Sequence, residues 1–452
     1  MCPDLDSLKV SRYLISAKDR VNRTSWIVYC LMTNALARID RLEFDFLCHF
    51  KRRSNWPDLP ANTIAQFYKL GMLIDQNLDE LAVLKAKNHR MRFRNDKFRL
   101  MVNPSLTCNF RCQYCYQEKE PSGTLAPHTE MLLKYLEDLA GSHSVVELSY
   151  YGGEALLHLD WMQRFYDSAS KIFARTESNL KMNNSVVTNG YLLTRNKAEQ
   201  LRDLGVEHVQ VTLDGPPRIH DMLRPTLDGK PTFFRTLSNI QDVCDLLSVT
   251  VRVNVSKQNS NDLVELLDIL VDRKLRNRIN IYLGPTEATT RASACFSRDC
   301  LEMAEFANLV PSFYRAALQR GFLLDWSPSP KSAFCMADCV DSSIVGPDLG
   351  LWKCPHHLGV GELKIGQLGR DPLPSEDALH FRFISWDPFA SRRCMECDLL
   401  PVCLGGCPDY AVRAVGQPRC EHWKTNLTEV LPWIALEQEC ALDVMPQSFG
   451  CE

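Results

Sequence analysis

An alternation of strand and helix patterns over residues 99–320 constrains the fold of this chain more than any other feature of its sequence. Short apolar runs with strand character are separated by amphipathic segments of helical length, such as Thr129–Leu139, Trp161–Ala174, Arg195–Leu204 and Leu263–Asp272. Repeated strand–helix units predict a parallel sheet covered by helices. The expected strands are Arg99–Val102, Val145–Tyr150, Lys181–Thr188, His208–Thr212, Thr250–Val255 and Ile279–Tyr282. About six units predict an α/β fold built as a partial (β/α)6 TIM-like barrel, with its site at the carboxyl ends of the strands.

The cysteine content points to metal or redox chemistry. Nineteen cysteines occur in 452 residues, three at 108–115 and eight between Cys335 and Cys420, while the others are isolated. We find no apolar run of about 18 residues and no signal-peptide pattern, so we expect a cytoplasmic protein without a membrane span. In that compartment disulfides explain a cysteine excess poorly, and metal binding explains it better.

The first cysteine group follows the first expected strand directly. It reads Thr107-Cys108-Asn109-Phe110-Arg111-Cys112-Gln113-Tyr114-Cys115-Tyr116. Three thiolates close a tetrahedral zinc site only with a fourth ligand. They suit three corners of a [4Fe–4S] cluster whose fourth iron is open to another ligand. Cys108, Cys112 and Cys115 are therefore candidate cluster ligands and catalytic residues.

This triplet, with an aromatic residue before its last cysteine, resembles the signature of the radical S-adenosylmethionine (SAM) superfamily over residues 99–420. The resemblance implies that the open iron chelates SAM, and that one electron cleaves the sulfonium to give a 5′-deoxyadenosyl radical which abstracts a substrate hydrogen. Further similarities follow in order: the stretch from Tyr151 to Glu154 resembles the GGE motif, and the one from Leu213 to Pro216, with His220, Asp221 and Arg224, resembles the family's SLDG stretch. Because side chains alternate along a strand, Arg252 and Asn254 of the fifth strand point to the same side. The implied SAM-binding residues are Tyr114, Gly152, Gly153, Glu154, Thr188, Asn189, Asp214, Arg252 and Asn254.

The second cysteine group has eight members, enough for two further sets of four. The spacing resembles the SPASM extension of radical enzymes that modify peptides and proteins, and most closely that of anaerobic sulfatase-maturing enzymes. The resemblance implies two auxiliary [4Fe–4S] clusters, three with the SAM cluster. It assigns Cys335, Cys339, Cys354 and Cys407 to the first, and Cys394, Cys397, Cys403 and Cys420 to the second. Two alternatives remain: Cys440 in place of Cys335, and a zinc ribbon over Cys394–Cys407.

One position departs from the sulfatase-maturing pattern. Those enzymes carry an Asp base directly after the cysteine equivalent to Cys354, where this chain has Pro355, followed by His356 and His357. Either histidine is a candidate catalytic base, because imidazole titrates near neutral pH. A surface or supporting role for these histidines is the alternative.

Residues 1–95 resemble a small winged-helix unit of the kind that recognises precursor peptides. Strands are expected at Arg12–Ser16 and Ser25–Met32, helices at Arg41–Phe50 and Ala61–Leu70, and a strand from Met72 to Ile74 after a Gly71 helix cap. Residues 85–99 carry seven Lys or Arg against one acid. This run is either a solvated connector or an attraction for an acidic peptide.

These patterns predict four segments: a recognition domain (1–95), the radical SAM partial barrel (96–320), a SPASM domain (321–425) and a C-terminal helical tail (426–452). The favoured hypothesis is a maturase that cross-links a ribosomally made precursor peptide through a thioether or carbon–carbon bond. Its partners would be that peptide with its leader and a flavodoxin- or ferredoxin-type electron donor, with no nucleic acid and no membrane. The alternatives are a protein maturase of the sulfatase type that oxidises Cys or Ser, a small-molecule radical SAM enzyme, and a metal-dependent winged-helix regulator.

Overall fold

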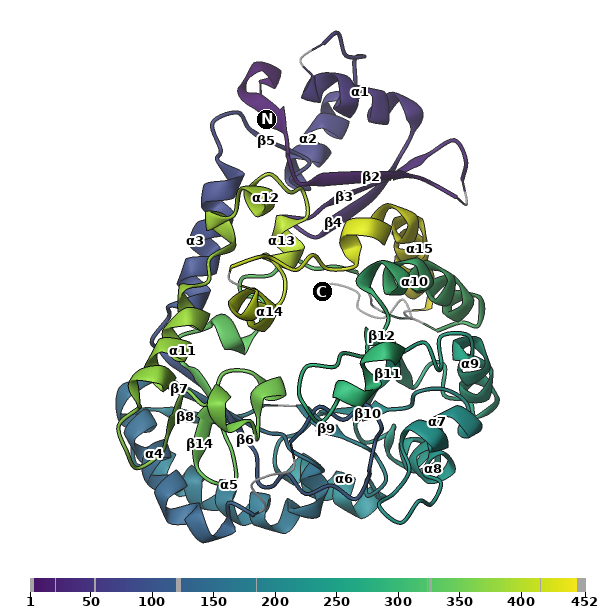
Figure 1. Ribbon diagram of the computed structural model, residues 1–452. Coiled ribbons are helices and arrows are strands. Elements are labelled where there is room, and N and C mark those ends of the chain that lie inside the picture. The colour runs from purple at the N-terminus through teal and green to yellow at the C-terminus, as the bar shows by residue number, and fades with distance from the viewer. Residues whose placement is uncertain are drawn as a thin grey trace, which may run out of the picture.

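The computed structural model describes residues 4–444 except 21, 53, 119–122, 184, 323, 325–326 and 415, and it leaves the side chains of 440–444 undescribed. Part of the predicted tail, residues 445–452, and the side chain of Cys440 therefore lie outside the description. Within the described part, no helix is both long and apolar enough to cross a membrane. Figure 1 shows a barrel at one end, the N-terminal sheets at the other, and helix-rich segments between them.

The N-terminal segment consists of two small antiparallel sheets and two helices. The central strand of the larger sheet is β3, flanked by β2 and β4, and β1 pairs with β5. Helix α1 begins at a capping box in which Asp40 and Glu43 each accept a backbone hydrogen bond from the other. Neither β1 nor β4 was predicted from the sequence. The elements are β1 (Leu8–Val10), β2 (Leu14–Lys18), β3 (Trp26–Cys30), β4 (Ala35–Ile39), α1 (Arg41–Lys51), α2 (Ala61–Lys69) and β5 (Leu73–Asp75).

Helix α3 (Glu80–Arg92) carries much of the basic run and extends along one edge of the molecule from the N-terminal sheets toward the barrel (Figure 1). The expectation of a solvated connector is wrong at the C-terminal end of α3, because Arg92 is buried there. Its guanidinium donates to the carbonyl oxygens of Asp338, Ile384 and Trp386. Three further basic residues form ion pairs: Arg94 with Asp96, and Lys97 and Arg99 with Glu147.

The barrel strands run parallel, as predicted, in two sheets. One sheet has β6, β7 and β8 in order, and the other has β9, β10, β11 and β12. The single strand expected over Lys181–Thr188 is two, because Asn183 accepts hydrogen bonds from the backbone and hydroxyl of Ser185 and turns the chain between them. The bounds are β6 (Lys97–Val102), β7 (Val145–Tyr150), β8 (Asn179–Met182), β9 (Ser185–Thr188), β10 (His208–Thr212), β11 (Ser248–Val255) and β12 (Ile279–Pro285).

Helices cover the outer face of these strands and share one large apolar core with them. Strand β11 illustrates the pattern: its valines are buried while Arg252 and Asn254 alternate with them and are half-buried. The helices are α4 (Thr129–Ser142), α5 (Leu159–Phe173), α6 (Arg195–Asp203), α7 (Pro217–Leu223), α8 (Phe233–Val243), α9 (Leu263–Asp272) and α10 (Met303–Gln319). This α/β architecture confirms the predicted class of the central segment.

The C-terminal segment extends the barrel sheet, which the sequence did not predict. Strand β13 pairs parallel with β6. Strand β14 pairs antiparallel with β13, and β15 pairs antiparallel with β14 at the edge of the sheet. The sheet therefore crosses the predicted boundary near residue 320. The elements are β13 (Ser342–Val345), β14 (Gly350–Trp352), β15 (Gly366–Gln367), α11 (Pro374–Ser385), α12 (Arg392–Met395), α13 (Leu400–Cys403), α14 (Pro408–Arg413) and α15 (Trp423–Val444). Helix α15 packs against α10 and the β2–β4 sheet.

Candidate radical SAM site

The carboxyl ends of the parallel strands surround a cavity of about 570 Å³. Its walls come from the loops after β6 and β7, from the ends of β9 to β12, and from three residues of the C-terminal segment, Phe334, His356 and Glu421. This is the position that a parallel α/β barrel gives an active site. The predicted residues on the wall are Cys108, Cys112, Tyr114, Cys115, Gly152, Gly153, Thr188, Asn189, Arg252, Asn254 and His356.

The three cysteines of the first group share one part of this wall. Their loop lies against the end of α7 and the residues after it, where the backbone N–H of Arg111 donates to the Pro225 carbonyl and that of Gln113 to the Leu223 carbonyl. Burial raises the pKa of Cys112 to about 12, and the neighbouring Arg224 opposes that shift. Because buried thiols ionise readily only beside a cation or metal, three convergent sulfurs suit a metal cluster better than free thiols.

Two glycines let the loop after β7 pack directly onto the triplet loop. A Cβ on Gly153 would lie 2.2 Å from the carbonyl oxygen of Thr107, and one on Gly152 would lie 2.8 Å from that of Ser105. The backbone N–H groups of Gly153 and Glu154 donate to these same carbonyls, at 3.2 and 3.0 Å. Only glycine permits this close approach, which sets the position of the cysteine loop relative to the loop after β7.

Glu154 is buried behind the cavity wall. Its carboxylate accepts hydrogen bonds from the Thr188 hydroxyl at 2.6 Å, the Asn189 N–H at 2.8 Å and the Leu156 N–H at 3.1 Å. Burial raises its pKa, and these bonds oppose the rise. In the structure Glu154 therefore holds the end of β9 in place; the SAM-binding role that the resemblance implies for it stays a prediction.

Tyr114 is the centre of a buried polar network. Its hydroxyl donates to Asp214 and accepts from Arg224 and from the Asn254 side chain, the last at 3.0 Å. Asp214 also accepts from the Asn254 N–H at 2.8 Å, and Arg252 donates to the Asn254 side-chain oxygen at 2.8 Å. The network ties the cysteine loop to β10 and β11. Asp214 lies wholly beneath the cavity surface, whereas Arg252 and Asn254 face the cavity.

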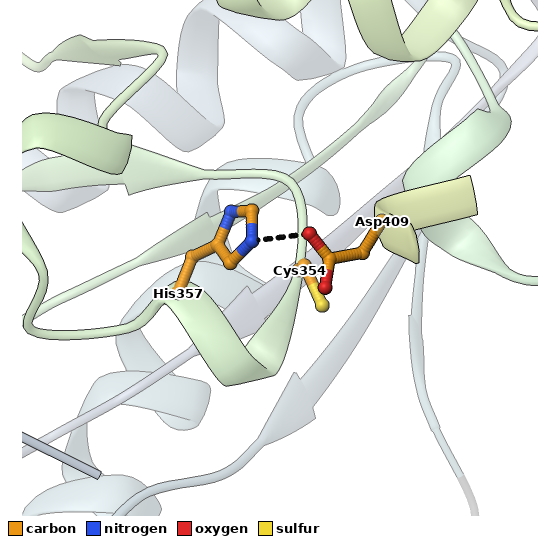
Figure 2. Close-up of side chains that lie close together, drawn as sticks. All are labelled: Cys354, His357 and Asp409. Carbon is orange, nitrogen blue, oxygen red and sulfur yellow. Dashed lines mark hydrogen bonds and ion pairs between the residues drawn. The ribbon is translucent and has the colours of Figure 1, made fainter. Parts of the chain in front are cut away.

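The two candidate histidines occupy different places. His356 lines the cavity, and its ring centre lies 4.2 Å from that of Tyr116. His357 is buried, and its Nε2 lies 2.6 Å from a carboxylate oxygen of Asp409. Figure 2 shows this pair beside Cys354, all three ligand atoms lying within 4.8 Å of one another. Only His356 is placed to meet a substrate in the cavity.

The cysteines predicted for the first auxiliary site converge from three distant segments. After burial, the neighbours that raise the pKa of Cys354 are Asp409, Cys335 and Cys407. Burial raises the pKa of Cys335 to about 12, with Asp338, Cys407 and Cys339 adding to it. Cys335 therefore lies near the other three thiols, an arrangement that suits one cluster.

The cysteines predicted for the second auxiliary site line one small cavity of about 30 Å³: Cys394, Cys397, Cys403 and Cys420. Gly406 makes this convergence possible, because its φ is +78° and an added Cβ would lie 1.8 Å from the Arg419 carbonyl oxygen. The tight turn after α13 thus brings Cys403 toward the segment that carries Cys420. These donor sets suit the predicted clusters.

Sequence reasoning did not assign several cavity residues. Tyr151, whose hydroxyl is hydrogen-bonded to that of Tyr116, precedes the glycine pair directly. Phe334 and Glu421 adjoin cysteines of the second group, and Glu287 follows β12. Each of these residues lies next to a predicted cysteine ligand or near the end of a strand in sequence. That position alone does not predict whether the side chain faces the cavity.

Comparison with known proteins identifies the central segment. Residues 102–287 match the Radical SAM superfamily. The chain carries a radical SAM domain. A "Fe-coproporphyrin III synthase" of Methanosarcina barkeri is 30% identical over 193 residues, covering 42% of this chain and 45% of that protein. A "Serine-type anaerobic sulfatase-maturating enzyme" of Bacteroides thetaiotaomicron is 23% identical over 380 residues, covering 74% of this chain and 90% of that protein.

Two solved structures share the fold of this chain. The structure of "anSMEcpe with bound AdoMet and Kp18Cys peptide" has a TM-score of 0.56 at 14% identity, covering 77% of this chain and 100% of that one. Streptococcus suis SuiB "bound to precursor peptide SuiA" has a TM-score of 0.51 at 15% identity, covering 91% and 97%. Both neighbours were solved with a peptide, as their titles state.

Gly153 gives a direct test of the packing beneath the cysteine triplet. We expect Gly153→Ala to lower the rate of SAM cleavage roughly 100-fold, because a shift of about 1 Å in a catalytic group can cost that much. The measurement is 5′-deoxyadenosine formed under anaerobic reducing conditions. Gly141→Ala is the matched control, since a Cβ there meets nothing within 4 Å. Equal rates in the two variants would contradict the packing argument.

Proposed function

We propose that this radical SAM protein is a maturase which abstracts a hydrogen from a ribosomally made precursor peptide and installs an oxidative cross-link, either a thioether or a carbon–carbon bond. The observation that carries the proposal is a second cavity of about 640 Å³ beside the first. The two share Thr286, Glu287 and Glu421 as lining residues. Two adjoining cavities suit a peptide that extends beyond its reacting residue, whereas a small molecule needs only one closed pocket.

The residues present suit the groups that the family uses. Cys108, Cys112 and Cys115 would hold the first [4Fe–4S] cluster, and Arg252, Asn254 and the glycine loop would position SAM. When bound, the cluster and SAM supply a carbon radical that takes a hydrogen atom from the substrate. The cysteines of the C-terminal segment would hold two auxiliary clusters.

Cross-linking removes two electrons and two protons from the peptide. Radical abstraction takes one electron and one proton together as a hydrogen atom. The second electron would go to an auxiliary site. The first group is near the cavity in sequence, because the cavity residues Phe334 and His356 lie next to Cys335 and two residues after Cys354. His356 is positioned to take the remaining proton. A flavodoxin- or ferredoxin-type donor would supply the electron that starts each turnover.

The proposal is tested with a peptide. The protein is co-expressed anaerobically with a candidate precursor containing Cys and aromatic residues, and the peptide is analysed by mass spectrometry. A loss of about 2 Da per event, with fragment ions missing between the joined residues, is expected for one cross-link. An aldehyde formed from Cys or Ser would instead favour sulfatase-type maturation, the second candidate, which the similarity to sulfatase-maturating enzymes supports and Pro355 opposes.

The N-terminal segment is proposed to bind an acidic leader of the precursor, with the leader adding a strand to its sheet. Lys85, Lys87 and Arg90 on α3 are exposed and have no ion pair among the described residues. We expect K85E/K87E/R90E to raise the KM for the precursor roughly tenfold at low salt and less at high salt, since exposed charges are screened. Uncoupled SAM cleavage should be unchanged. The control K134E/K171E/R175E reverses three exposed charges near α4 and α5, and an equal KM in the two variants would contradict leader attraction by α3.

A further inference from the structure

Two sulfurs of the second auxiliary group each accept a hydrogen bond from a cation. The Arg393 guanidinium donates to Cys420 Sγ at 3.1 Å, and the Lys424 ammonium donates to Cys397 Sγ at 3.3 Å. Hydrogen bonds and positive charge at cluster sulfurs stabilise the reduced, more negative state.

The first auxiliary group has a different environment. Its donors are mainly backbone N–H groups, and the one cationic donor, Arg99, lies 3.6 Å from Cys339 Sγ. Two buried carboxylates stand beside its sulfurs, Asp338 and Asp409. Each carboxylate is paired with its own arginine: Asp338 with Arg92 and Asp409 with Arg413. The buried Lys353 ammonium donates to the Cys339 carbonyl oxygen and not to a sulfur. Among the described residues, cations therefore donate to two sulfurs of the second group, at 3.1 and 3.3 Å, and to one of the first group, at 3.6 Å.

From this contrast we infer that Arg393 and Lys424 raise the reduction potential of the second auxiliary site, because each places a positive charge on one of its sulfurs. This inference rests on the proposed function, since it takes both groups to hold clusters.

The test is a redox titration of the anaerobically reconstituted full chain, followed by electron paramagnetic resonance at low ionic strength. A background variant with Cys108, Cys112 and Cys115 changed to Ala isolates the auxiliary signals. We expect R393Q/K424Q to reduce the reduced-to-oxidised ratio of the second site about tenfold at a fixed potential, which is about 59 mV for one electron. The first site should not move.

Two further variants keep the inference falsifiable. R393K/K424R retains both charges and should retain the potential. Arg392, the neighbour of Arg393 on α12, pairs with Glu396 at 2.6 Å and has no sulfur contact, so R392Q should also leave the potential unchanged. Unchanged potentials in R393Q/K424Q at full iron content would overturn the inference alone. Wild-type protein that binds only about 4 iron atoms, where three clusters need about 12, would overturn the proposed function instead.

Discussion

Replacing Cys112 by Ala should lower the formation of 5′-deoxyadenosine from SAM to the uncatalysed background. Two thiolates remain at the first site, and neither Tyr114 nor Asp214 can replace the third, because both are engaged in the buried network. We also expect reconstituted iron to fall from about 12 to about 8 atoms per chain, because only the cluster at the cavity loses a ligand. The measurements are product quantification under anaerobic reduction and iron analysis of the same preparation.

Cys244→Ala is the control for this experiment. Cys244 is half-buried at the end of α8, and its thiol donates to the Gln241 carbonyl oxygen rather than facing the cavity. It should keep full SAM cleavage and full iron. SAM cleavage that persists in the Cys112 variant would refute the role of the triplet, whereas equal loss in both variants would indicate general damage to the fold.

The barrel and its site could be predicted from sequence because their signals are local. Strands such as Val145–Tyr150 and His208–Thr212 are read directly from apolar runs, and the motifs lie at the ends of these strands. Since parallel strands bring their carboxyl ends to one edge, motifs far apart in sequence had to meet. The placement of Arg252 and Asn254 on the cavity wall follows from the alternation of side chains along β11.

Features that depend on tertiary packing could not be predicted in the same way. Strand β13 pairs with β6 across more than 200 residues, and nothing in its short sequence specifies that partner. The different positions of His356 and His357 depend on one turn of 3-10 helix. This turn directs the His356 ring to the cavity and the His357 ring to Asp409. The sequence predicts an exposed basic run on α3, because composition does not reveal that Arg92 is buried.

Replacing this buried arginine is expected to cause a large loss of stability. Arg92 is 1% exposed and its guanidinium lies 3.6 Å from the Asp338 carboxylate. We expect Arg92→Met to destabilise the protein by about 3–5 kcal/mol, because removing one partner leaves an uncompensated buried charge. The measurement is the free energy of unfolding by denaturant under anaerobic conditions. Arg90→Met, on the exposed face of α3, should change it by no more than about 0.5 kcal/mol.

A double-mutant cycle separates the lost ion pair from lost packing. Asp338→Asn removes the negative charge, so the R92M/D338N protein should lose less stability than the sum of the single variants, with a coupling of about 1–3 kcal/mol. Additive losses would contradict the ion-pair explanation. The pair also bears on the first auxiliary site: the Asp338 carboxylate accepts from the backbone N–H of Phe334 and Cys335 and so holds the turn between Cys335 and Cys339. Iron content should therefore fall in Arg92→Met and stay normal in Arg90→Met, because the buried Arg92 side chain links α3 to the turn that carries Cys335 and Cys339.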